Sequence, residues 1–108
     1  MPYISKEKRK LFDDKILLLV DALQDGNVDN PPTAGDLNYV ISELLSVSLD
    51  IGANPRYNKI NTAVGVLECV KLEFYRRLAG PYEDIKIAEQ GDISVYARFT
   101  EWLSKYFC

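Results

Sequence analysis

The sequence predicts an all-α protein: a compact bundle of four to five helices that forms a single helical domain over residues 1–108. Apolar residues recur three and four positions apart over most of the chain, which is the spacing of one helix face. Proline, glycine and asparagine gather between these stretches. A length of 108 residues suits one domain. The helices are expected at about 7–24, 34–50, 57–78, 82–90 and 94–107.

The first predicted helix, 7–24, carries more apolar surface than one neighbour covers. One face is marked by Phe12, Ile16, Leu19, Val20 and Leu23. A second strip, interrupted by Lys15, is formed by Leu11, Leu18 and Ala22. We therefore expect this helix to be central or to meet a partner chain. Strong turn formers follow over 25–32 and predict an exposed loop.

The second predicted helix, 34–50, begins at a capping signal. Thr33 and Asp36 have the spacing at which a hydroxyl and a carboxylate each accept a hydrogen bond from a free backbone amide. Near its end, apolar and polar residues alternate over 47–51, a pattern that strands also show. We expect a helix there, ended by Gly52.

Glycine and proline set the boundaries of the remaining helices. The third, 57–78, is expected to end at Gly80 and Pro81 and, at 1.5 Å per residue, to span roughly 33 Å at the centre of the bundle. The fourth, 82–90, starts with two acidic residues, as the helix dipole favours, and stops at Gly91. The fifth, 94–107, has one apolar stripe, formed by Val95, Phe99, Trp102, Leu103 and Tyr106.

Charge and composition exclude several classes of function. Thirteen basic and sixteen acidic residues give a net charge of −3. This sign disfavours a surface that binds nucleic-acid phosphates or anionic lipid, so nucleic acid is an unlikely partner and no membrane is expected. Histidine is absent, which excludes Ser-His, Cys-His and Glu-x-x-His chemistry.

The cysteines and the apolar runs predict a cytoplasmic protein. Cys69 and Cys108 have neither the number nor the spacing of a disulfide scaffold or a zinc site, and Cys69 is expected to be a buried small apolar residue. The opening MPYISKEKRK lacks the apolar stretch of an export signal. The longest apolar run, 16–20, is far shorter than the ~20 residues of a membrane span.

A charged pair interrupts the apolar side of the third predicted helix. Glu68 and Lys71 fall between apolar positions there, and burying such charges requires further polar partners. Asn61, Tyr75 and Tyr82 are the candidates, so these five residues form the predicted polar pocket or interface. As a pocket, the five residues would surround Glu68 and Lys71, and desolvation would shift the pKa values of these two charged groups toward acid or base work. As an interface, they would fix the register between helices or subunits.

Helix-borne carboxylates offer an alternative chemistry with Mg²⁺ or Mn²⁺. The acidic candidates are Asp36, Glu43, Glu68, Glu73, Glu83 and Asp84, with Tyr39 beside the first two. The paired Glu-x-x-Glu and Glu-x-x-Asp pattern of helical pyrophosphohydrolases is missing, and no glycine-rich phosphate loop occurs. The sequence therefore predicts no catalytic residue, no metal ligand and no cofactor.

Four blocks carry a family resemblance. They are MPYI, GDLNYVI at 35–41, VLECVKLEFYRR at 66–77 and PYEDIKIAEQGDI at 81–93. They resemble a family of short uncharacterised bacterial and phage proteins, which is described only as a domain of unknown function. The resemblance implies a small cytoplasmic or phage-encoded protein and transfers no active-site residue.

Two hypotheses for the function follow. The first is a small non-enzymatic helical interaction or assembly protein, a homodimer, because catalytic motifs are absent and the first helix has spare apolar surface. The alternative is a Mg²⁺- or Mn²⁺-dependent nucleotide or phosphate-ester hydrolase that uses helix-borne carboxylates.

Overall fold

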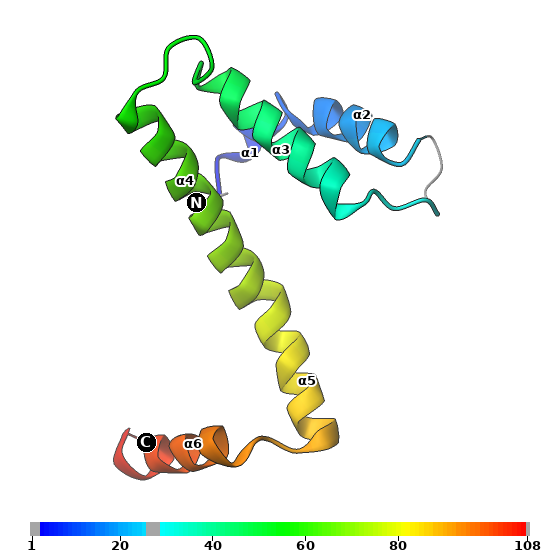
Figure 1. The fold of residues 1–108 in the computed structure, drawn as a ribbon. Coiled ribbons are helices and arrows are strands. Elements are labelled where there is room, and N and C mark those ends of the chain that lie inside the picture. Colours follow the sequence, from blue (N-terminus) through cyan, green and yellow to red (C-terminus); the bar gives the residue numbers. More distant parts are fainter. Residues whose placement is uncertain (1–2, 26–28, 108) are drawn as a thin grey trace. The chain divides into compact units, whose positions relative to one another are not determined.

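The structure is a computed structural model that describes residues 3–25 and 29–107 (Figure 1). Over these residues the backbone forms helices, turns and loops and no strand, which confirms the all-α class. The chain divides into two units, Met1–Val70 and Lys71–Cys108, and each is described by itself. The single domain over 1–108 stays a prediction.

The first predicted helix is two helices. The short helix α1, Lys6–Arg9, is capped by the Ser5 hydroxyl, which accepts a hydrogen bond from the amide of Lys8 at 3.1 Å. It ends in two tight i→i−3 bonds, from the amides of Leu11 and Phe12. Helix α2, Asp13–Leu23, then restarts with two acidic residues in its first turn. Because the backbone between them stays close to helical, the apolar spacing continues across the break.

The capping box that begins α3, Ala34–Ser48, is confirmed. The Thr33 hydroxyl accepts from the amide of Asp36 at 3.1 Å, and the Asp36 carboxylate accepts from the amide of Thr33 at 3.0 Å. The predicted end is wrong, because Asp50, with φ of 53°, takes the left-handed position expected of Gly52. The amide of Ile51 then bonds the carbonyl of Ser46, which satisfies the helix end.

Helix α4 spans Tyr57–Phe74, and its last four residues belong to the second unit. The predicted stop at Gly80 and Pro81 is wrong. A π-helical segment, Tyr75–Ala79, follows α4, and α5 continues as Gly80–Gln90. The amide of Gly80 reaches back five residues to the carbonyl of Tyr75. This wider turn accommodates Pro81, which has no N–H and would crowd the carbonyl four residues before it in a regular helix.

Helix α6, Ser94–Phe107, has the predicted bounds (Figure 1, orange to red). It follows Gly91, whose φ of 84° with ψ of 153° is a conformation that essentially only glycine adopts. The predicted loop at 25–32 is described only in part, since residues 26–28 lie outside the described residues. Asp29 and Asn30 form a turn and a bend.

In the part of the chain that the structure describes, the apolar faces of the helices form no packed core. Among the described residues Ala63 is the one that is buried, whereas large apolar side chains on α2, α3, α4, α5 and α6 are exposed. The compact bundle that the sequence predicts is therefore not confirmed. Helical spacing identifies the apolar face of each helix but does not determine what covers it.

Candidate functional site

The five residues of the predicted pocket or interface are all exposed. Asn61 and Glu68 lie on the part of α4 that belongs to the first unit. The second unit holds Lys71 at the end of α4, Tyr75 in the π-helical segment and Tyr82 on α5. The two tyrosine residues are 57% and 60% exposed. The structure thus encloses none of the five residues.

Glu68 and Lys71 differ from the prediction in their surroundings. The sequence placed both side chains against an apolar core, but both are exposed, as are their neighbours Val64 and Leu72. No buried charge therefore has to be compensated at this position of the chain. The role of the pair at an interface stays a prediction.

Tyr75 has a partner that the sequence analysis did not identify. Its hydroxyl donates a hydrogen bond of 3.0 Å to the Glu83 carboxylate on α5. This hydrogen bond, and the negative charge of the same carboxylate, raise the pKa of Tyr75 above its ordinary value of 10.0. The pair holds a proton on the phenol rather than activating it as a base.

The π-helical segment explains why residues eight apart can meet. In a regular helix, eight residues turn through about 800°, which leaves their side chains about 80° apart. An extra residue accommodated in a wide turn makes this spacing equivalent to seven residues, about 700°, close to two full turns. Tyr75 and Glu83 therefore share a face. Sequence spacing alone could not identify this pair without knowledge of the wide turn.

Tyr82 belongs to a second polar cluster on α5. The ammonium of Lys86 lies 5.5 Å from the centroid of the Tyr82 ring and 3.2 Å from a carboxylate oxygen of Glu89. These contacts follow the i,i+4 and i,i+3 spacings of one helix surface, so they could have been found from the sequence. All three residues are exposed, and such a cluster contributes little to stability.

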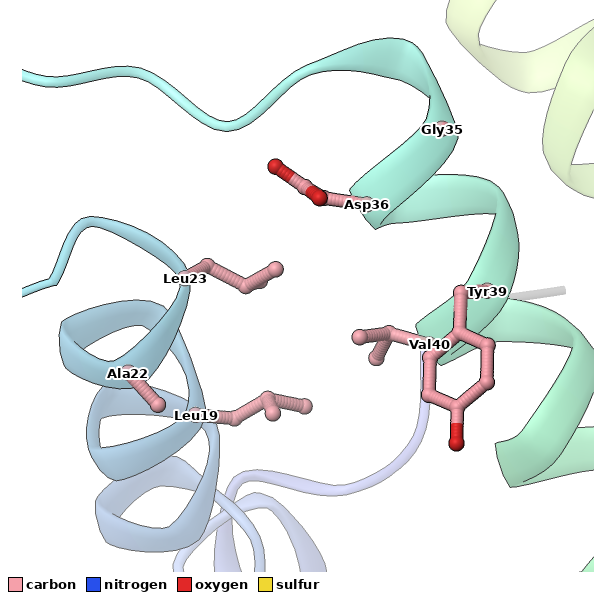
Figure 2. A pocket seen from close by; sticks show the side chains of 7 residues that line it. All are labelled: Leu19, Ala22, Leu23, Gly35, Asp36, Tyr39 and Val40. Carbon is pink, nitrogen blue, oxygen red and sulfur yellow. The ribbon is translucent and has the colours of Figure 1, made fainter.

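A hollow of about 360 Å³ lies in the first unit between α2 and α3. Leu19 and Leu23 of α2 point toward Val40 of α3, and Asp36 and Tyr39 lie at the edge (Figure 2). The Asp36 carboxylate already accepts the capping hydrogen bond from the amide of Thr33. The hollow is therefore an apolar space with a polar rim, suited to cover by apolar side chains rather than to bond-breaking chemistry.

The alternative of a metal-dependent hydrolase gains no support from these positions. In the part of the chain that the structure describes, no three His, Cys, Asp or Glu side chains lie where they could hold a metal ion. Cys69 is exposed, which corrects the expectation of a buried thiol. None of the described helices is both long and apolar enough to cross a membrane.

Comparison with known proteins gives a family match. The family model of a domain of unknown function, DUF6899, matches residues 1–93. Neither the curated proteins nor the solved structures give a significant match to the chain. The match ends one residue before α6 begins at Ser94.

Proposed function

Because the chain belongs to the DUF6899 family of domains of unknown function, which assigns it no chemistry, we propose a function from its exposed surface. The protein is a non-enzymatic helical assembly module, and its partner is a second copy of the same chain. The observation that carries this proposal is the exposure of the large apolar side chains of α2 and α3.

The exposed residues are too apolar for helices that stand alone. On α2, Leu17 and Leu18 are exposed, and on α3 so are Leu44 and Val47. Fixing the backbone of one residue costs about 1–2 kcal/mol. Covering one large apolar side chain returns about 1.5–3 kcal/mol. Burying these apolar faces against a partner would therefore stabilise α2 and α3 markedly.

A second copy is the partner that fits best. It is present wherever the chain is, and a two-fold axis brings the same apolar patch of both copies together. When two α2 helices pair antiparallel about Leu18, Lys15 of one copy lies level with the partner's Asp21, three residues on either side of the axis. Opposite charges at this level favour the pairing and set its register.

The predicted polar residues take part in this proposal as polar contacts between each unit and a partner chain. Asn61 and Glu68 would serve on the first unit, and Lys71, Tyr75 and Tyr82 on the second. We also propose that the assembly forms in the cytoplasm of a bacterial or phage-infected cell, for which the resemblance of the sequence blocks is the support.

The mass of the protein in solution tests the proposal. Light scattering during size-exclusion chromatography should give twice the chain mass of 12.3 kDa at high concentration, and Leu18→Glu should return it to the mass of one chain. Ser42→Glu adds the same charge at an exposed polar position of α3 and should leave the dimer intact. A mass of 12.3 kDa at every concentration contradicts the proposal.

A further inference from the structure

Helix α6 is more amphipathic than α2, α3, α4 or α5. At 100° per residue, its central stripe falls within about 60° of the helix circumference. Val95, Phe99, Trp102 and Tyr106 make up this stripe, and all four side chains are exposed. The helix therefore presents an apolar surface along its whole length.

The stripe is mainly aromatic. The Trp102 ring lies 6.2 Å from that of Phe99, 5.2 Å from that of Tyr106 and 5.4 Å from that of Phe107, measured between centroids. Paired helices interlock chiefly through aliphatic side chains. Tryptophan and tyrosine, with an apolar body and a polar tip, suit a boundary between an apolar phase and water.

Two cations border the stripe. Arg98 and Lys105 are seven residues apart and lie along the same edge, whereas Glu101 lies further round the helix. Residues 94–107 hold these two basic residues and one acidic residue, a net charge of +1 in a chain of net charge −3. The long stems of Arg98 and Lys105 allow their charges to reach anions beside an apolar surface.

We propose that α6 is an interfacial helix that lies on an anionic lipid bilayer. Its aromatic stripe would enter the boundary between headgroups and acyl chains, and Arg98 and Lys105 would meet the lipid phosphates. Such a helix lies on the membrane without crossing it, so it needs no spanning segment. The net negative charge of the whole chain, which disfavours contact with anionic lipid, arises outside α6. The cytoplasmic leaflet is the negatively charged side of a membrane.

This inference is independent of the proposed dimer, which involves α2 and α3. Helix α6 begins where the family match ends, so the lipid-binding segment is an addition to the shared domain. A monomeric protein could still bind lipid through α6, and a dimer could fail to bind it. The two tests therefore give separable results.

Trp102, the one tryptophan of the chain, is a built-in probe at the centre of the stripe. The full chain is titrated with vesicles of phosphatidylglycerol and phosphatidylcholine, and in parallel with phosphatidylcholine alone. We expect Trp102 emission to move to shorter wavelength and to resist quenching by acrylamide with the anionic vesicles. Arg98→Gln with Lys105→Gln should weaken this partitioning roughly 30-fold, since each cation near the surface contributes about fivefold.

The control removes the same charge elsewhere in the second unit. Arg77→Gln with Lys86→Gln should leave partitioning to anionic vesicles within about twofold of that of the unchanged chain. Circular dichroism establishes that both variants keep their helix content. An equal loss of partitioning in the two double variants overturns the proposal, and so does a Trp102 emission that does not respond to vesicles. An emission shift that depends on protein concentration alone also overturns it, and would assign the stripe to a second copy.

Discussion

The hydrogen bond between Tyr75 and Glu83 links the titration of a tyrosine to one carboxylate. Glu83→Gln removes the negative charge that disfavours the phenolate, so we expect the pKa of Tyr75 to fall toward 10.0. Absorbance of tyrosinate during alkaline titration measures this change. Because the chain has seven tyrosines, Tyr75→Phe provides the difference spectrum that isolates this residue.

The same bond has a defined pH dependence. The pKa of Tyr75 in the folded protein is raised above that of the unfolded chain, so its contribution to stability is complete below pH 10 and is lost as the pH rises through the folded value. An equal pKa in the parent protein and in Glu83→Gln would show that the bond does not form in solution.

At the scale of single residues, hydrogen bonds that follow from local sequence spacing were predictable. A hydrogen bond that depends on a distorted helical turn was not. The reciprocal bonds of Thr33 and Asp36 follow from a three-residue spacing at a helix start. The Tyr75–Glu83 pair depends on a wide turn that the sequence did not indicate. The exposure of Glu68 and Lys71 depends on what covers α4, which no local pattern specifies.

At the scale of elements, the cap of α3 can be tested by removing one hydroxyl. Thr33→Ala leaves the amide of Asp36 without its acceptor and should destabilise α3 by about 1 kcal/mol. Thr62→Ala is the matched control, because the Thr62 hydroxyl bonds the carbonyl of Asn58 within α4 and caps no helix. Thermal unfolding followed by circular dichroism, at a concentration at which the chain is associated and melts cooperatively, measures both variants. An equal loss of stability would contradict the capping role.

The π-helical segment gives a second prediction at this scale. Pro81→Ala restores the missing N–H and removes the ring, so the turn at 75–79 should relax toward a regular helix. Tyr75 and Glu83 would then leave their common face, and the pKa of Tyr75 should fall toward 10.0, as in Glu83→Gln. An unchanged Tyr75 titration in Pro81→Ala would show that proline does not cause the wide turn.

The elements themselves were largely predictable from the apolar spacing. The bounds of α6 agree with the prediction, and α3 begins where its capping box indicates. The break between α1 and α2 was missed because the backbone there stays near helical, which preserves the spacing. The continuation through Gly80 and Pro81 was missed because a wide turn can absorb a proline that usually ends a helix.

At the scale of the whole molecule, the helical class was predictable but the packing was not. Periodicity shows that α2 has apolar residues on more than one side, and the structure leaves many of them exposed. Both proposals start from these exposed apolar side chains. One assigns the faces of α2 and α3 to a second copy, and the other assigns the stripe of α6 to lipid.

The burial of Ala63 alone among the described residues also governs how the chain unfolds. The heat-capacity increment of unfolding grows with the apolar area that water newly reaches, and a sharp transition requires helices that share an interior. We therefore expect a chain that is too dilute to associate to lose its helices gradually on heating, with a small heat-capacity change in calorimetry. Association would convert this gradual melting into a cooperative one, and folding and assembly would become a single equilibrium.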